Sequence, residues 1–172
     1  IDVFKSKFFG SSSVWDLGGN GWYSVTGVAG QFDLEILNSR DNPDAFGQPN
    51  VSRIIFGGTQ AQLNIDTIGI AQSIDVGNFD TEETAVVLLD LIEPLWGIIP
   101  RAGNVPLEDV LAAAIGAVGV HEAGHFFGAW HTLNGNASNQ IMDTGGNLDG
   151  LIGVGTDGIF GTADDRNVQF GT

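Results

Sequence analysis

Residues 107–131 read LEDVLAAAIGAVGVHEAGHFFGAWH, and this stretch decides the fold. The sequence predicts one long helix that begins near Pro106 and continues to about Phe127, since proline is favourable in a first helical turn. Apolar residues occur on nearly every side of this helix, so we expect it to be buried in the core. Gly128 can adopt a positive φ angle and therefore predicts the end of the helix.

Three short strands are predicted before this helix. Residues 32–37 alternate apolar and polar side chains, as in a half-buried strand, and residues 51–56 are predicted as a second strand that Gly57 and Gly58 end. The third predicted strand comprises Gly69, Ile70, Ala71, Gln72, Ser73 and Ile74. Residues 38–50 predict a loop, and residues 1–30 predict irregular structure with one or two short strands.

A second helix is predicted over residues 81–92. Asp80 is suited to the N-cap position, Glu83 to the third helical position, and Pro94 would end the helix. The predicted fold class is therefore α+β, a small twisted mixed sheet packed on a buried helix. No repeat or long linker divides the chain, so residues 1–172 are expected to form one domain. Its upper part, residues 1–128, would hold the sheet and helices, and its lower part, residues 129–172, would be irregular.

The composition argues against several classes of protein. With 21 acidic and 6 basic side chains, the 172-residue chain has a formal charge of −15, which disfavours binding to nucleic acids and to anionic membranes. The longest apolar run, residues 110–120, is shorter than the ~20 residues of a membrane-spanning helix. The chain has no cysteine, so disulfides and thiol chemistry are excluded.

The end of the long predicted helix carries a metal-ligand pattern. His121 and His125 are four residues apart and therefore lie on one helix face, where two imidazoles can bind one zinc ion. Past Gly128 the chain can turn and bring back His131 as a third ligand. Three protein ligands leave a fourth position for water, and the adjacent Glu122 could deprotonate that zinc-bound water.

Chance is the alternative explanation, because the short pattern His-Glu-x-x-His also occurs in helices that bind no metal. The longer pattern fixes five positions. All three histidines of the chain lie at its ligand positions. This distribution favours a metal site.

The eleven residues from His121 to His131 match H-E-x-x-H-x-x-G-x-x-H, and the chain thus resembles the metzincin clan of zinc metalloproteases. Met142, the one methionine, follows His131 by eleven residues, and the resemblance implies that it supports the histidines from a methionine turn. Two features depart from the clan. Residues 1–30 lack the expected long helix and strand, and Thr144 stands where some subfamilies have tyrosine.

The resemblance implies a metzincin-like fold and hydrolysis of peptide bonds by a zinc-bound water that Glu122 activates. The partner would be a protein or peptide substrate, paired with an edge strand above the zinc, for which residues 69–74 are the candidate. An ordinary inner strand is the alternative for these residues. By analogy, Leu133 and residues 144–146 would line the pocket after the scissile bond.

Residues 36–47, 69–84 and 157–165 are also similar to uncharacterised secreted bacterial proteins, so a secreted bacterial protein is implied. A processed form is expected, because the chain begins with Ile1 and shows no signal-like segment.

An acidic loop near the C-terminus is a candidate calcium site. Asp157, Asp164 and Asp165 are spaced by glycines in a way that lets oxygen ligands converge, and Asn147 and Asp149 could join them. A solvated acidic turn is the alternative.

Two further functions remain open at this point. The chain could be a zinc-stabilised structural or surface-assembly module that cleaves nothing, although such a site has no use for Glu122. It could also be a metallohydrolase that acts on a non-peptide bond.

Overall fold

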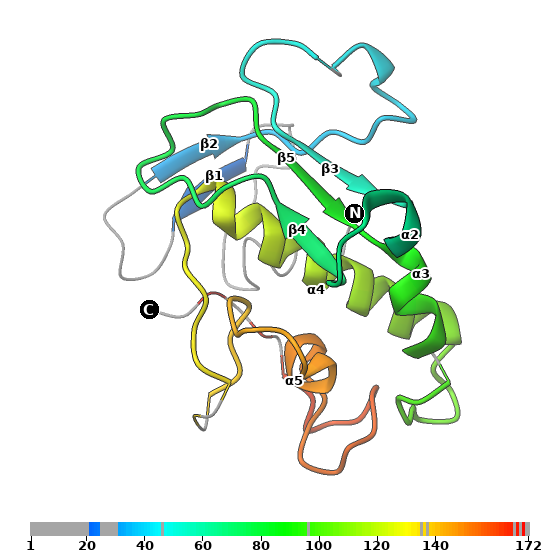
Figure 1. Ribbon diagram of the computed structural model, residues 1–172. Helices are drawn as coiled ribbons and strands as arrows, with labels where there is room; N and C mark the ends of the chain where they lie inside the picture. Colours follow the sequence, from blue (N-terminus) through cyan, green and yellow to red (C-terminus); the bar gives the residue numbers. More distant parts are fainter. Residues whose placement is uncertain are drawn as a thin grey trace.

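The computed structural model describes residues 21–24, 31–45, 47–95, 97–134, 136, 138–166, 168 and 170. Within these residues a three-stranded mixed sheet packs against one long helix, so the predicted α+β class is confirmed. Figure 1 shows this helix, α4 (Leu107–Phe126), between the sheet and α5 (Leu148–Ile152). Of the irregular segment predicted over residues 1–30, most lies outside the described residues.

The sheet has β5 (Thr84–Val87) in its centre, between β3 (Arg53–Phe56) and β4 (Gly69–Ala71). β3 runs parallel to β5, whereas β4 runs antiparallel to it, with Gly69 opposite Val87. The strands predicted over residues 51–56 and 69–74 are therefore present but shorter. β4 forms one edge of the sheet.

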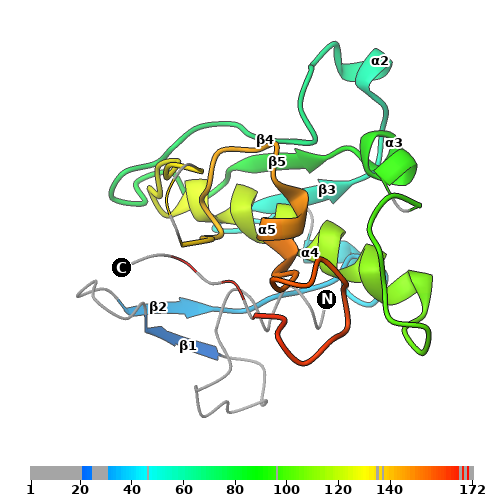
Figure 2. The ribbon, with the colours of Figure 1, turned by 90° about the horizontal axis from the view of Figure 1, so that it is seen from below.

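A separate antiparallel hairpin consists of β1 (Gly21–Ser24) and β2 (Gln31–Leu34). The strand predicted over residues 32–37 corresponds to β2 and ends earlier than expected. Figure 2 shows this hairpin on the opposite side of α4 from the three-stranded sheet.

The helix predicted over residues 81–92 is wrong in its first part. Residues 84–87 form the central strand β5, and the helix that follows, α3 (Leu89–Ile92), is a single turn. Buried and half-buried residues alternate along β5, which is the period of a strand. This segment is rich in β-branched residues and pairs with a strand on each side. Both features favour a strand and outweigh the local signals for a helix start.

Asp80 does not cap a helix. Its carboxylate accepts a hydrogen bond from the backbone N–H of Glu82 at 3.1 Å, which closes a turn before β5. Glu83 is fully buried, and its carboxylate accepts a hydrogen bond from the hydroxyl of Ser73 at 2.6 Å. Neither acidic residue therefore has the role in a helix start that the sequence predicted.

The prediction of the long helix is confirmed. Pro106 occupies its N-cap, and the helix ends at Phe126. Most of its buried residues in the second half are Ala, Gly or Val, so the sheet can approach the helix closely. The main apolar core comprises Val87, Ile92, Ile99, Val110, Ala113, Ala114, Ala117, Val118 and Ile152.

The described residues after Gly128 contain the short helix α5 and are otherwise irregular, as expected. Phe160 forms an isolated parallel β-bridge with Arg101, so the backbone of this part pairs with the segment before α4. Gly153 adopts φ +87°, and a Cβ there would clash with the carbonyl oxygen of Arg166. The remaining short elements are η1 (Pro43–Ala45), α2 (Gln60–Leu63) and η2 (Glu93–Leu95).

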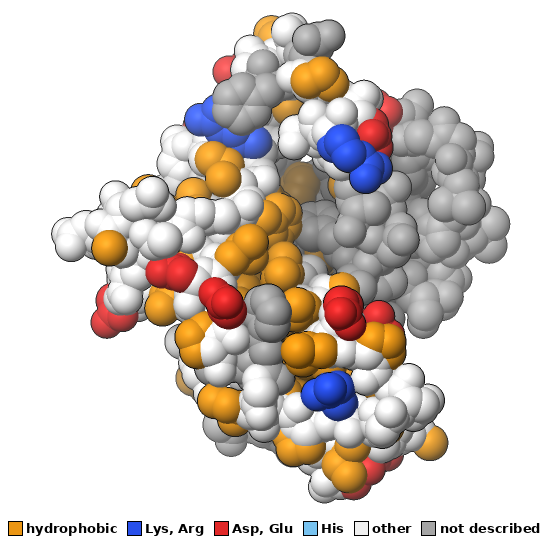
Figure 3. Space-filling view, turned by 90° about the vertical axis from the view of Figure 1, so that its right-hand side faces the viewer, with side chains coloured by type: hydrophobic (Ala, Val, Ile, Leu, Met, Phe, Trp, Pro, Cys, Tyr) orange, Lys and Arg blue, Asp and Glu red, His pale blue; other side chains and the backbone are white. Residues whose placement is uncertain are grey.

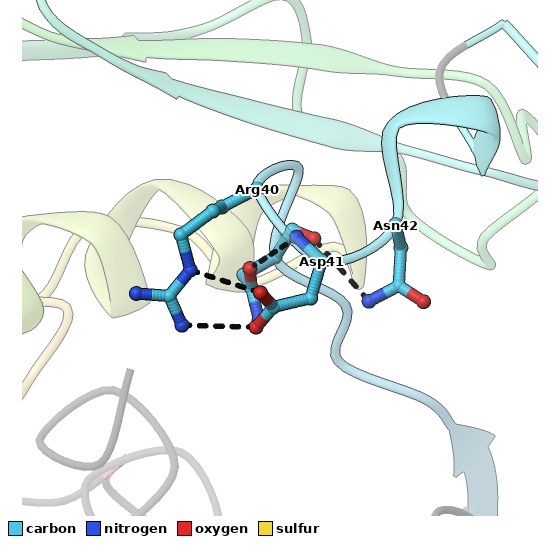
Figure 4. Close-up of polar contacts among 4 residues, drawn as sticks. Arg40, Asp41 and Asn42 are labelled. Atoms are coloured by element: carbon cyan, nitrogen blue, oxygen red, sulfur yellow. Dashed lines mark hydrogen bonds and ion pairs between the residues drawn. The ribbon is translucent and has the colours of Figure 1, made fainter.

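The loop predicted over residues 38–50 is held by its own polar side chains where it begins (Figure 4). Arg40 donates two hydrogen bonds to the carboxylate of Asp41, both 2.9 Å long, and Asn38 donates a third at 2.8 Å. The Arg40 guanidinium, and after it the Asn38 amide, lower the pKa of Asp41. Because these groups are exposed, they shape the loop more than they stabilise the protein.

Hydrophobic side chains form a band down the middle of the face seen in Figure 3, and charged side chains lie around it. Among the described helices, none is both long and apolar enough to cross a membrane.

Replacement of Ile92 by alanine tests the position of the core. Ile92 is 1% exposed, so Ile92→Ala should lower the free energy of unfolding by about 2–5 kcal/mol. Ile98 is 70% exposed, and Ile98→Ala should change the free energy of unfolding by less than about 0.5 kcal/mol. Urea unfolding measures both values, and equal effects at the two positions would contradict this core.

Candidate metal centre

Three imidazole rings converge at the C-terminal end of α4. The Nε2 atoms of His121 and His131 are 3.1 Å apart, and one ligand nitrogen from each of the three histidines lies within 4.8 Å of the others. A tetrahedral zinc ion with Zn–N bonds of about 2.05 Å holds its nitrogen ligands about 3.3 Å apart. The three histidines could therefore bind a single metal ion of this kind if the longer N–N separations close.

Backbone carbonyls orient the two helical imidazoles. His121 Nδ1 lies 2.7 Å from the carbonyl oxygen of Ile141, and His125 Nδ1 lies 2.8 Å from that of Ala129. A carbonyl only accepts hydrogen bonds, so each Nδ1 carries the proton and each Nε2 presents a lone pair. This is the usual way in which a protein prepares histidines for a metal.

The facing nitrogens of His121 and His131 need either a proton or a metal ion between them. A lone pair on His121 Nε2 repels the facing nitrogen of His131, 3.1 Å away, unless a proton or a metal ion lies between them. Burial lowers the pKa of His121 to about 4, and burial also lowers the pKa of His125. Both imidazoles therefore stay neutral, the form that binds metal, at neutral pH.

The turn after α4 brings the third histidine back. Gly128 has φ +78°. Its N–H donates a hydrogen bond to the carbonyl of His125 at 3.0 Å, and the N–H of Ala129 donates one to the carbonyl of Gly124 at 3.0 Å. These two bonds form a Schellman motif. A Cβ on Gly128 would also clash with the backbone of Val76, so glycine is required here for its conformation and for space.

His121 and His125 are buried, whereas His131 is exposed. The centre therefore lies where the core meets solvent.

Glu122 is a buried carboxylate beside this triad. It is 5% exposed, and the backbone N–H of Ala71 in β4 donates a hydrogen bond to it. Burial raises the pKa of Glu122 to about 7, and the hydrogen bond from Ala71 opposes this shift. A pKa near neutrality suits a group that accepts and then releases a proton.

Met142 packs directly on the metal-binding turn of α4. It is 3% exposed, and a Cβ on Gly124 would clash with its sulfur. Its neighbour Ile141 supplies the carbonyl that orients His121. This contact is compatible with support of the histidines, which stays a prediction.

A second connection joins the segments that follow His131 and Met142. The N–H of Thr132 bonds to the carbonyl of Met142 at 2.7 Å, and the hydroxyl of Thr132 bonds to Asp143 at 2.7 Å. This pair fixes the residue directly after His131. The sequence did not predict this connection, since Thr132 and Asp143 lie outside the histidine motif.

The remaining predicted site residues lie on the sheet edge and on exposed loops. Gly69–Ala71 lies at the edge of the sheet, and residues 72–74 follow this strand. Leu133 and residues 144–146 are exposed, and the segments that hold them adjoin, because Asn134 donates a hydrogen bond to the carbonyl of Gly145 at 3.0 Å. A pocket formed by these residues stays a prediction.

The carboxylates of the acidic loop accept hydrogen bonds from other groups of the same loop. Asp164 accepts hydrogen bonds from Thr162, Thr156 and the N–H of Asp157, and the first two hydroxyls lower its pKa to about 2. Asp165 accepts from the N–H groups of Gly155 and Gly161.

Asp157 accepts a hydrogen bond from the N–H of Ile159, and Asn147 caps α5. Asp149 lies in the first turn of that helix. Among the described residues, the converging ligand group comprises the three histidines. The calcium site stays a prediction.

Comparison with known proteins adds nothing to this geometry, because no family model, curated protein or solved structure matches the chain. The three-histidine cluster with its neighbouring glutamate is consistent with a zinc site of the His-Glu-x-x-His type.

Zinc binding provides a direct test of the centre. The protein should bind one zinc ion per chain and gain about 2.7 kcal/mol of stability when free zinc is 100 times its dissociation constant. His131→Ala removes one of three ligands and should abolish most of this gain. Leu133→Ala, an exposed apolar neighbour, is the control and should bind zinc like the wild type. An undiminished zinc-dependent gain in His131→Ala would contradict the assignment.

The stability of the metal-free protein should reveal two opposing titrations. Because the pKa of His121 is lowered to about 4, this imidazole is protonated in the unfolded chain but neutral in the folded protein between pH 6.5 and 4. His121 therefore destabilises the fold as pH falls through this window. The raised pKa of Glu122 means that the folded protein holds a proton between pH 4.5 and 7, so this group favours the fold as pH falls.

Two variants separate these contributions. Glu122→Gln should lose more stability than the wild type as pH falls from 7 to 4.5, because the opposing contribution of Glu122 is absent. His121→Asn, whose amide can still donate to the Ile141 carbonyl, should lose less. Chemical denaturation in chelator at several pH values measures both slopes. Identical slopes for the two variants would show that neither group is buried as described.

Proposed function

We propose that this protein is a zinc-dependent endopeptidase of the metzincin type. The observation that carries the proposal is the convergence of three histidine nitrogens beside the buried Glu122. That it is a secreted bacterial protein is part of the same proposal and rests on the resemblance of the sequence alone.

His121, His125 and His131 would hold the zinc ion. Bound zinc would supply a Lewis acid that polarises the scissile carbonyl and makes water more acidic. The carbonyls of Ile141 and Ala129 keep two of the three imidazoles in the orientation and tautomer that binding requires.

Glu122 would move the proton. Burial raises the pKa of Glu122 to about 7 in the metal-free protein. Beside bound zinc, this carboxylate would accept a proton from the attacking water and return that proton to the leaving amine. Water adds to the carbonyl carbon, the C–N bond breaks, and the products are a carboxylic acid and an amine.

β4 would hold the substrate. It is an edge strand, and the N–H of Ala71 in this strand contacts Glu122. A peptide that pairs with this edge would therefore run past the carboxylate that serves as base. This supports a protein or peptide in extended conformation as the substrate class.

Replacement of Glu122 distinguishes the proposal from the structural alternative. Glu122→Gln should lower the rate of cleavage of unfolded proteins or peptides by about 10²- to 10⁴-fold, since the general base is lost. Zinc content should be unchanged, because Glu122 is not one of the converging ligands. Glu82→Gln alters an exposed glutamate and is the matched control.

If wild type and Glu122→Gln are equally inert while both bind zinc, the protein is a zinc-stabilised module instead. If the protein cleaves an ester or another non-peptide bond but no peptide, it is a metallohydrolase of another substrate class.

A further inference from the structure

The backbone of β4 has one side paired with β5 and one side turned outward. Leu88 N–H bonds to the carbonyl of Ile68 at 2.7 Å, and Gln72 N–H bonds to the carbonyl of Thr84 at 2.9 Å. In an antiparallel ladder the hydrogen-bonded residues alternate with residues whose N–H and C=O point away from the partner. Gly69 and Ala71 occupy these outward positions.

Two of these outward groups have partners within the chain. The N–H of Ala71 donates to the carboxylate of Glu122, and the carbonyl of Gly69 accepts from the hydroxyl of Thr67 at 2.9 Å. The side chain of Glu122 thus reaches from α4 to the edge of the sheet.

Gly69 lies where this carboxylate crosses β4. A Cβ built on Gly69 would clash with the carboxylate of Glu122 and would lie 2.9 Å from Cγ1 of Val118. Gly69 belongs to a regular strand and is not among the positive-φ glycines, so its backbone conformation is open to any residue. What glycine provides here is space, as it often does where another group approaches a strand closely.

We propose that Gly69 is a positioning residue for the base of the proposed endopeptidase: its missing side chain lets Glu122 reach the N–H of Ala71, which fixes the carboxylate at the edge strand. The inference rests on the proposed function for its catalytic consequence. The contact between Gly69 and Glu122 itself is independent of that function.

Small displacements of a reacting group are costly, since a shift of about 1 Å can lower a rate about 10²-fold. A methyl group at position 69 displaces the carboxylate from Ala71 and leaves the metal ligands unchanged. Gly69→Ala should therefore lower kcat at least about tenfold, change KM little and leave zinc content unchanged.

A double-mutant cycle measures the contact without any activity assay. In the wild-type background Gly69→Ala should lower the urea midpoint of the zinc-bound protein. In the Glu122→Ala background the carboxylate is gone, and the same change should have a clearly smaller effect. Gly103→Ala is the matched control, because Gly103 has open space around its Cβ position and no positive φ.

Val118 provides the competing explanation, because it also faces Gly69. If Val118→Ala, and not Glu122→Ala, removes the effect of Gly69→Ala on the midpoint, Gly69 serves packing and the inference is overturned. A wild-type kcat in Gly69→Ala also overturns it.

Failure of the proposed function has a different signature. The wild type would then cleave no peptide, while the cycle would still report whether Gly69 makes room for Glu122. A coupling between these two residues would support the placement, and its absence would reject it.

Discussion

Two imidazoles and a carboxylate enter the core on one turn of α4, and each of these polar groups needs a hydrogen-bonding partner to be tolerated there. The partners come from three separate parts of the chain. Ile141 supplies a carbonyl to His121, Ala129 supplies one to His125, and Ala71 supplies an N–H to Glu122. This requirement joins the sheet edge, the turn after the helix and the methionine loop to one another.

Glycines make these three connections sterically possible. Gly69 leaves space for the carboxylate of Glu122, Gly124 for the side chain of Met142, and Gly128 for the backbone near Val76. A methyl group would displace the carboxylate of Glu122 at the first position, the sulfur of Met142 at the second and the backbone of Val76 at the third. The precision of the centre therefore depends on close packing around α4 as much as on the histidines themselves.

The sequence predicted the parts of this centre that lie within one local pattern: the long helix, its end at Gly128 and the spacing of the three histidines. It failed over residues 81–92, where local signals for a helix start were stronger than the alternation of β5, and pairing on both sides decided the outcome. The roles of Gly69 and Ala71 could not be predicted, because they depend on contact with a helix that begins some forty residues later. A glycine within a predicted strand was the available signal.

The position of Glu122 supports the proposed catalytic function over a purely structural role for the histidine cluster. A carboxylate removed from water costs free energy, and burial here raises its pKa to about 7. Glu122 stands outside the converging ligand group, so metal binding gains nothing directly from this cost. Stability alone would be served better by an apolar residue at this position. In the proposed endopeptidase, the role of proton acceptor beside the scissile carbonyl would account for an ionisable group at the outward edge of β4.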